Sequence, residues 1–359
     1  MSTLRSPVVA YEAETHPNAD RLELAVVDGW RVVCRIGDFA AGEQVAHIPE
    51  GSILPQDLIV EMGLDDPPRL AGSKHNRVKA IRLRGVLSQG LIYAGERIAH
   101  LDLGDDAADA LGLTKWVPPV PVHMSGTMVP GPKIGFDIDD IKAWPDRLRA
   151  GEAVVVTEKL HGTFCCVGLR REEQGVEPEA VVSSKGHLSN GLRFDLSTAD
   201  NDDNLYVKVW RRHAEGVRRA FDACSDGDDP FEMYLFGEIC GPKVQDLNYG
   251  LVEPALHLFD VRLRHGYEDW DDVVAVAGVA GIEPVPELWR GPWSPELLET
   301  HTDGSSQLAG HHREGIVVRP AAGRYDTGLE HPSGRGPGRV IFKSVSARHL
   351  LRKGGTEYQ

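Results

Sequence analysis

Five prolines within residues 116–132 divide this chain of 359 residues into two parts. Proline lacks an amide donor and fixes φ, so a stretch of this kind forms a stiff, extended connector and not an element of a hydrophobic core. We therefore expect a first domain over residues 1–115, a proline-rich linker over 116–135 and a second domain over 136–359. The chain is long enough for two domains of ordinary size.

Short strand-like segments separated by Gly, Pro and Asp occupy the first domain. Their spacing is typical of a small antiparallel β-barrel. The clearest are residues 22–27, 31–36, 44–48 and 91–94.

The second domain mixes β-rich segments with two helical patterns. The helical patterns, over 206–221 and around 273–280, have apolar residues at a period near 3.6. This mixture predicts an α+β fold and not a strictly alternating βαβ chain. The β-rich segments are residues 153–157, 163–169, 180–184, 232–239, 256–262, 315–319 and 340–343.

The formal net charge of −15 excludes a uniformly basic surface, so any nucleic-acid binding must use a local basic stretch. Residues 71–95 contain no Asp or Glu and are rich in Lys and Arg. We expect this basic stripe to bind backbone phosphates, although a solvated strand face has the same composition. Its basic residues are Lys74, Arg77, Lys79, Arg82 and Arg84.

Five cysteines without a CxxC pair argue against a disulfide scaffold or a closed zinc site. They favour a reducing cytoplasm. The longest apolar run, residues 273–282, is too short to cross a bilayer. We therefore expect a cytoplasmic protein that does not associate with membranes, and we expect it to be monomeric.

Lys159 follows the apolar segment 153–157 and precedes a turn at Gly162. A lysine at a strand end can present its amine to a phosphate, and it becomes a nucleophile once it has lost its proton. Alone this pattern is weak, because strand-end lysines and turn glycines are common. The residues that follow in order strengthen it, because their motifs each lie on the edge of a predicted strand: Lys185, Glu238, Phe259, Glu314 and Lys343.

This ordered set resembles the covalent nucleotidyltransferase superfamily of ATP-dependent ligases and capping enzymes. The likeness is strongest to the second family of phage RNA ligases and to bacterial RNA ligases with an N-terminal OB domain. His161 stands where DNA ligases and capping enzymes usually have Asp. The resemblance covers roughly residues 136–353 and implies antiparallel sheets flanked by helices. In the first domain, residues 16–22 and 81–91 resemble an OB fold of the tRNA-binding type.

The resemblance implies roles for the residues around the first motif. Lys159 would become covalently bound to AMP. Glu158 would lie beside the adenine edge, and His161, followed by the turn at Gly162, would lie near the phosphates. Lys185 occupies the position of a basic residue close to the nucleotide.

The later motifs complete the implied site. Glu238 and Glu314 would contact the sugar or hold a divalent ion, Mg²⁺ or Mn²⁺. Phe259 would stack on the adenine. Lys343 would contact the α-phosphate and, as a neighbouring cation, lower the pKa of Lys159.

Two positions depart from the family pattern. Ile341 replaces the first lysine of a Lys-x-Lys pair, so phosphate contact by two lysines is not expected here. Phe164 stands where the phage enzymes tend to have Asn, so that side-chain contact to the RNA end is also not expected.

The function implied is that of an ATP-dependent RNA ligase, which seals a 5′-phosphate to a 3′-OH in RNA or in an RNA-containing nicked duplex, as RNA repair requires. The alternatives are a DNA ligase, a GTP-using capping enzyme, or a nucleic-acid-binding adaptor with a vestigial nucleotide pocket. The adaptor is disfavoured because the lysines and carboxylates of the motifs are all present.

Overall fold

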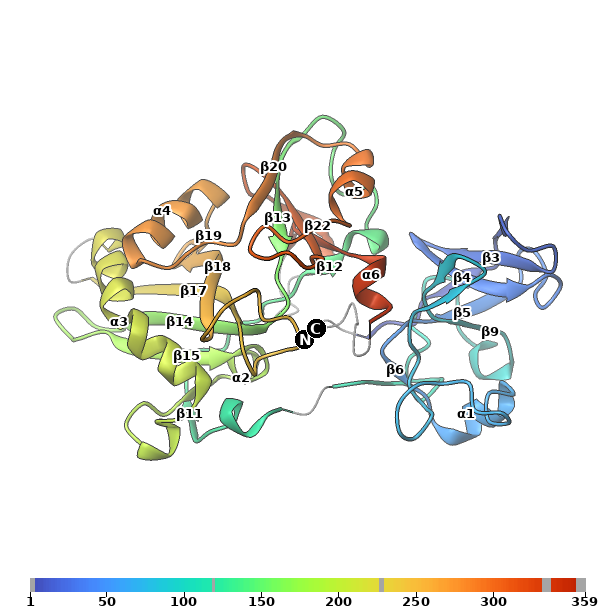
Figure 1. The fold of residues 1–359 in the computed structure, drawn as a ribbon, viewed down its shortest axis with the longest axis horizontal. Helices are drawn as coiled ribbons and strands as arrows, with labels where there is room; N and C mark the ends of the chain where they lie inside the picture. The colour runs from blue at the N-terminus through green and yellow to red at the C-terminus, as the bar shows by residue number, and fades with distance from the viewer. Residues whose placement is uncertain (1–3, 118–119, 226–228, 331–336, 353–359) are drawn as a thin grey trace. The chain divides into compact units, whose positions relative to one another are not determined.

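The chain forms two compact units in the computed structural model, which describes residues 4–117, 120–225, 229–330 and 337–352. Figure 1 labels many of their elements. The central unit contains residues 120–138 and 146–344, and the N-terminal unit contains the described residues before 118, residues 139–145 and residues 345–352.

The assignment of residues 139–145 and 345–352 to the N-terminal unit differs from the expected domain over 136–359. For the C-terminal segment the cause is hydrophobic burial. Val345 and Leu350 are buried against Ala80, with Leu87 packed beside them, so the segment forms a small hydrophobic cluster with the N-terminal unit. The boundaries expected at residues 115 and 136 stay a prediction.

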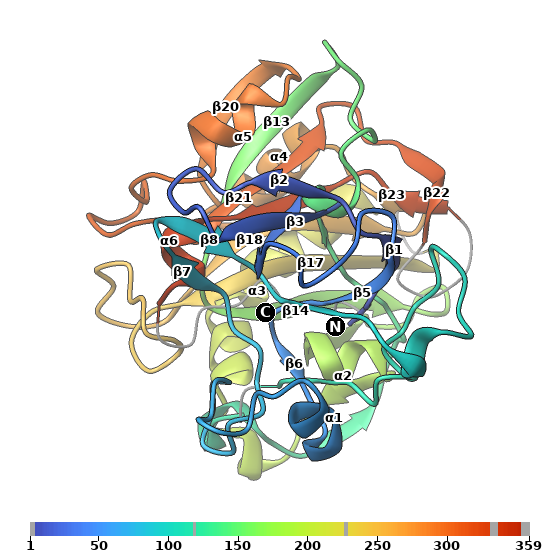
Figure 2. The same ribbon diagram turned by 90° about the vertical axis from the view of Figure 1, so that its right-hand side faces the viewer.

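Small antiparallel sheets build the N-terminal unit (Figure 2). Strand β5 pairs with both β1 and β9, β3 pairs with both β2 and β4, and β7 forms a hairpin with β8. The strands predicted over 22–27 and 44–48 are confirmed at those bounds. The elements are β1 (Val8–Ala10), β2 (Ala13–Thr15), β3 (Leu22–Val27), β4 (Trp30–Arg35), β5 (Gln44–Ile48), β6 (Ser52–Ile53), α1 (Gln56–Glu61), β7 (Ile81–Leu83), β8 (Val86–Ser88), β9 (Leu91–Tyr93), β10 (Thr114–Lys115), β12 (Asp139–Asp140) and α6 (Ala347–Leu350).

Two large antiparallel sheets build most of the central unit, and the strand pairs β11–β16 and β22–β23 form two smaller ones. One large sheet has the strand order β15-β14-β17-β18-β19, and the other contains β24, β21, β13 and β20 in that order. The elements are β11 (Met128–Pro130), β13 (Ala153–Lys159), β14 (Thr163–Arg171), β15 (Glu179–Ser184), α2 (Lys185–Ser189), β16 (Leu192–Phe194), α3 (Leu205–Cys224), β17 (Phe231–Cys240), β18 (Ala255–Leu263), β19 (Gly266–Tyr267), α4 (Trp270–Ala280), β20 (Glu287–Pro292), α5 (Glu296–His301), β21 (Gly315–Pro320), β22 (Tyr325–Glu330), β23 (Pro337–Arg339) and β24 (Phe342–Val345).

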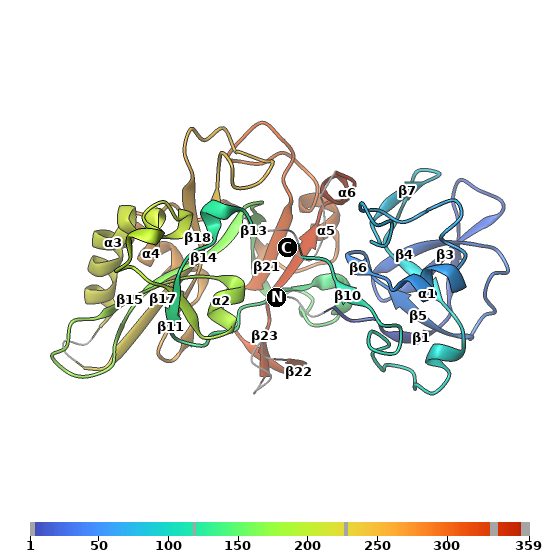
Figure 3. The same cartoon turned by 90° about the horizontal axis from the view of Figure 1, so that it is seen from below.

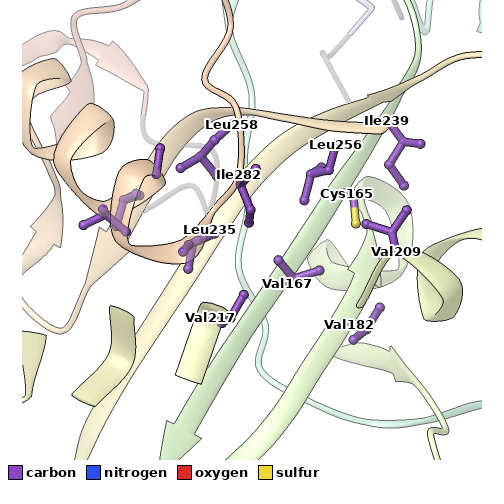
Figure 4. Packing of buried hydrophobic residues seen from close by; sticks show 14 of the residues in the cluster. Cys165, Val167, Val182, Val209, Val217, Leu235, Ile239, Leu256, Leu258 and Ile282 are labelled. Carbon is purple, nitrogen blue, oxygen red and sulfur yellow. The ribbon is translucent and has the colours of Figure 1, made fainter. Parts of the chain in front are cut away.

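Helices α3 and α4 cover one face of the five-stranded sheet (Figure 1). Helix α3 begins at Leu205, after Asn204, whose side chain accepts hydrogen bonds from two backbone amides of the first turn. Between the helices and the sheet lies the main core, in which Val217, Leu235 and Ile282 meet (Figure 4).

The opposite face of the five-stranded sheet carries an aromatic cluster. Successive strand residues point to opposite faces, so Cys165 lies in the main core, whereas Cys166 lies on the aromatic face with Phe236 and Tyr234. The aromatic face is the one that carries Glu238, because Glu238 alternates with Phe236 along β17 across a buried Gly237. The helices therefore close one side of the sheet and leave the other side to the functional residues.

Within the described residues, no helix combines the length and the hydropathy that crossing a membrane requires.

Candidate nucleotidyl-transfer site

Lys159 is the last residue of β13, which lies between β20 and β21. Lys159 pairs in register with Gly315, and this pairing places Glu314, the residue before β21, beside the lysine. Lys159 Nζ donates a hydrogen bond to Glu314 Oε1 over 2.5 Å. The Lys159 side chain is 18% exposed and that of Glu314 is 1% exposed. The strand end thus presents an amine that a buried carboxylate holds in place.

The pKa of Lys159 is raised. Burial alone would lower it, but the nearby carboxylates of Glu314 and Glu238 outweigh burial and stabilise the ammonium form. This differs from the expectation that Lys343 would lower the pKa of Lys159. The reason is the direct ion pair with Glu314, to which the charge of Glu238 adds.

Glu238, on β17, is the second carboxylate of this cluster. It is half-buried, and burial raises the pKa of its carboxyl to about 7, against the opposing effect of the Lys159 charge. Glu238 and Glu314 come from different sheets and both act electrostatically on Lys159. Carboxylate oxygens are the donors that Mg²⁺ and Mn²⁺ prefer, so this pair fits a divalent ion.

His161 is buried between two carboxylates. Its Nδ1 lies 3.5 Å from Glu314 Oε2, and its Nε2 lies 2.9 Å from Asp246 Oδ1. The backbone amide of His161 donates to the hydroxyl of Tyr249 over 2.6 Å. Asp246 and Tyr249 lie in the connection between β17 and β18, which no sequence motif marks.

Gly162 allows the chain to pass close to β17. A Cβ atom at this position would lie 2.1 Å from the carbonyl oxygen of Ile239, which is far inside van der Waals contact. Any larger residue would therefore push the turn away from β17 and separate Lys159 from Glu238.

Glu158 is buried on the strand that carries Lys159. Its Oε2 accepts a hydrogen bond from the amide of Gln307 over 2.8 Å. Its Oε1 has no hydrogen-bond partner among the described residues. A buried carboxylate oxygen of this kind can receive an N–H donor from a ligand.

Lys185 and Lys343 form a second cluster around Asp137. The two lysines were predicted from the sequence, but Asp137 was not. Lys185 Nζ lies 3.1 Å from Asp137 Oδ1. Burial opposes ionisation of Asp137, yet the charges of Lys185 and Lys343 lower its pKa. Lys185 directly follows β15 of the five-stranded sheet, and Lys343 lies in β24 of the other sheet, so the cluster joins the two sheets. Two cations that share one carboxylate leave an excess of positive charge, which suits a phosphate.

Phe259 sits at a bulge of β18. Its neighbours Leu258 and Asp260 pair with Gly237 and Phe236, so Phe259 is the extra residue. Its ring centroid lies 5.4 Å from that of Phe136.

A buried ion cluster holds the backbone at this bulge. Arg319 Nη2 donates to the carbonyl oxygen of Phe259 over 2.9 Å. The guanidinium of Arg319 lies 3.6 Å from the carboxylate of Asp260, and that of Arg339 lies 2.5 Å from it. These contacts were not predicted from the sequence, although Asp260 and Arg319 fall inside the predicted strands 256–262 and 315–319.

The two departures from the family pattern have structural uses. The ring of Phe164 lies 6.0 Å from that of Phe259 and 5.4 Å from that of Phe136, so Phe164 belongs to the aromatic cluster. Ile341 is buried. Both residues therefore contribute packing at these positions.

The basic stripe of the N-terminal unit is only partly exposed. Lys74, Arg82 and Arg84 are exposed. The Arg77 guanidinium stacks 4.1 Å from the ring centroid of Trp116, and Lys79 Nζ donates to the carbonyl oxygen of Arg352. Burial, with the nearby charges of Arg77 and Arg352, lowers the pKa of Lys79.

Comparison with protein families yields two matches. Residues 152–345 match the RNA ligase family, and residues 8–94 match an OB-fold domain. No curated protein matches the chain.

The chain is also similar to solved structures of the Naegleria gruberi RNA ligase. For a mutant with ATP and Mn the TM-score is 0.77 at 22% sequence identity, covering 99% of this chain and 100% of that one. For the ligase with PPi the TM-score is 0.75 at 23% identity, covering 97% and 98% of the two chains. The predicted α+β fold, an OB-like barrel followed by a ligase-type nucleotidyltransferase domain of antiparallel sheets, is confirmed.

Proposed function

Because the chain belongs to the RNA ligase family, we propose that it seals RNA with ATP through a lysyl-AMP intermediate. Lys159 Nζ attacks the α-phosphorus of ATP, a P–N bond forms, and pyrophosphate leaves with the electrons of the broken P–O bond. An oxygen of the 5′-phosphate of the nucleic acid then attacks the AMP phosphorus, a P–O bond forms, and the P–N bond breaks to release the amine of Lys159. Finally a 3′-OH attacks that phosphate, and AMP leaves as the strand is joined.

The observation that carries this proposal is that two carboxylates lie near the amine of Lys159. Glu314 is hydrogen-bonded to its amine, and Glu238, from the other sheet, adds a second carboxylate nearby. This arrangement fixes the position of the amine before any reaction, which is how an enzyme reduces the entropic cost of attack. The amine attacks in its neutral form, so its proton must leave first; Glu314, at 2.5 Å, is placed to accept it.

The other site residues have roles in binding ATP. The free Oε1 of Glu158 is proposed to accept from the adenine amino group, and Phe259 to stack on the ring. Lys185 and Lys343 are proposed to neutralise the phosphates, with His161 nearby.

A divalent ion completes the proposed site. Solved structures of the Naegleria gruberi ligase are described with ATP and Mn and with AMP and Mn. In this chain Glu238 and Glu314 would hold Mg²⁺ or Mn²⁺, which would offset the negative charge of the triphosphate.

The first experiment incubates the purified protein with α-labelled ATP or GTP and separates the products by denaturing electrophoresis. We expect label on the protein from ATP and none from GTP. Label from GTP alone would indicate a capping enzyme, and no label from either would indicate an adaptor with a vestigial pocket.

The second experiment tests the nucleic acid. Two nicked duplexes differ only in ribose or deoxyribose at the last nucleotides on the 3′-OH side. We expect sealing to require ribose, because the 2′-OH favours the sugar pucker that aligns the attacking 3′-OH. Equal sealing of both would favour a DNA ligase.

A further inference from the structure

The hairpin of β7 and β8 ends in a turn that its sequence does not favour. Leu83 pairs with Val86, so Arg84 and Gly85 form a two-residue loop. Their φ angles are +46° and +89°, both in the left-handed region. Turns of this type strongly prefer Asn, Asp or Gly at the first position, because a longer side chain strains the backbone there.

The same unit contains a second two-residue turn, whose first residue has a similar φ angle and is of a favoured type. Strands β3 and β4 are joined by the two-residue loop Asp28-Gly29, in which Asp28 has φ +48°. Nearly the same φ angle is therefore reached with Asp in one hairpin and with Arg in the other. Formation of the turn does not account for an arginine at position 84, and non-glycine residues held at positive φ are frequent at functional sites.

Two hydrogen bonds hold the strained turn in place. The side-chain amide of Asn18 donates to the carbonyl oxygen of Arg84 over 3.0 Å, and Arg82 Nη1 donates to that of Gly85 over 3.2 Å. Asn18 belongs to the segment 16–22 that resembles tRNA-binding OB folds. At the other end of the hairpin, the Ser88 hydroxyl accepts from the amide of Val33 in β4 over 3.0 Å, which anchors the hairpin to the barrel.

The hairpin also concentrates the exposed positive charge of the basic stripe. It lies at the edge of the N-terminal unit (Figures 2 and 3). Arg82 and Arg84 are exposed, whereas Arg77 and Lys79 are engaged in the contacts described above. No acidic residue occurs between residues 71 and 95 to cancel this charge.

We propose that Arg84 at the tip of the β7–β8 hairpin contacts a backbone phosphate of the RNA substrate, and that Asn18 holds it in the conformation for this contact. The proposal rests on the proposed function, because it assumes that RNA is the substrate. Of the five basic residues in the expected stripe, Arg84 is thus the one assigned to a phosphate contact, and its backbone conformation is strained.

The decisive variant is Arg84→Asn, because Asn removes the charge and also suits the left-handed turn. We expect its thermal unfolding temperature to rise while its affinity for RNA falls several-fold. RNA binding is measured by fluorescence anisotropy of a labelled single-stranded RNA at several salt concentrations. Loss of one phosphate contact lowers the slope of log affinity against log salt by about 0.7, a change that a purely structural role would not cause.

Three further variants sharpen the test. Arg35→Asn removes an equally exposed arginine elsewhere in the barrel and should change neither the affinity nor the slope. Arg84→Lys keeps the charge and should keep the slope. Asn18→Ala keeps Arg84 and should weaken binding without changing the slope.

The outcomes separate this proposal from the proposed function. A more stable Arg84→Asn protein with unchanged RNA affinity and slope overturns the proposal, as does a wild-type protein that binds no RNA. If RNA binding depends on Arg84 but the wild-type protein takes no label from ATP, the hairpin proposal stands and the ligase function fails.

Discussion

Two clusters in the central unit are both built from ammonium and carboxylate groups, but in opposite ratios. Around Lys159, one ammonium group lies close to two carboxylates, those of Glu314 and Glu238. Around Asp137, one carboxylate lies close to two ammonium groups, those of Lys185 and Lys343. The first cluster has an excess of negative charge once both carboxylates ionise, and the second has an excess of positive charge.

A site for a nucleotide must bind both a divalent ion and phosphate groups, and the two clusters differ in which of these they attract. A divalent ion is attracted to the acidic cluster, where the reacting amine lies, whereas phosphate oxygens are attracted to the basic cluster. Because the excess negative charge and the excess positive charge lie on different residues, each can be altered by mutation without removing the other. The predictions below exploit this independence.

The largest effect is expected from Lys159→Ala. We expect no covalent AMP on this variant, because no other amine occupies the end of β13. The exposed Lys208→Ala, which removes a lysine paired with Asp203 on the surface, serves as control and should retain labelling. Labelling with α-labelled ATP and a thermal unfolding curve are measured together, and label on Lys185 or Lys343 in the variant would refute the assignment.

The second effect concerns Glu314→Gln. This change removes the charge paired with Lys159, and we expect sealing of nicked RNA to fall on the order of a hundredfold. The control is Glu299→Gln, which alters an exposed carboxylate of helix α5. Wild-type sealing by Glu314→Gln across a range of Mg²⁺ concentrations would show that the acidic cluster is not part of the site.

The third effect is on stability and follows from the raised pKa of Glu238. Its folded-state pKa of about 7 exceeds the ordinary value of 4.5, so the native protein keeps a proton that the unfolded chain has lost between these values. Stability contributed by this group is therefore present at low pH and lost as the pH rises towards 7. In Glu238→Gln this contribution to the fall of the free energy of unfolding with pH, at most about 3 kcal/mol, should disappear. Urea unfolding at pH 5 and pH 8 measures it; an equal pH dependence in the variant and the wild type would contradict the prediction.

The smallest effect is expected from Asp137→Asn. Removing the shared carboxylate leaves Lys185 and Lys343 without their common counter-charge, so binding of ATP should tighten by about 1 kcal/mol. Calorimetric titration with ATP tests this, and Asp203→Asn, which neutralises an exposed carboxylate, controls for net charge. Weaker ATP binding by Asp137→Asn would mean that Asp137 positions the lysines and does not compete with phosphate.

The residues of the acidic cluster could be predicted from the sequence more completely than those of the basic cluster. Glu238, Glu314 and Lys159 each follow or precede a strongly apolar segment, and the alternation of strand residues determines where such ends lie. Asp137 and Asp246 lie in segments without periodicity, and their partners are distant in sequence, so only tertiary packing brings them together.

The sequence can also predict a site residue correctly without predicting which groups surround its side chain. Lys159 was expected to have a lowered pKa because Lys343 is a cation of the same site. The direction depends on which charges lie nearest, and sequence order carries no information on this distance. Phe164 is a similar case, because its place in the aromatic cluster depends on Phe136, 28 positions earlier.

The packing of Val345 and Leu350 against Ala80 has a consequence for how the protein is made. The N-terminal unit begins the chain but needs residues that the ribosome adds near its end. The central unit is therefore inserted in sequence within the other unit, and its described residues are synthesised before Val345 and Leu350. During synthesis, the apolar surface at Ala80 and Leu87 therefore stays uncovered until Val345 and Leu350 have been made.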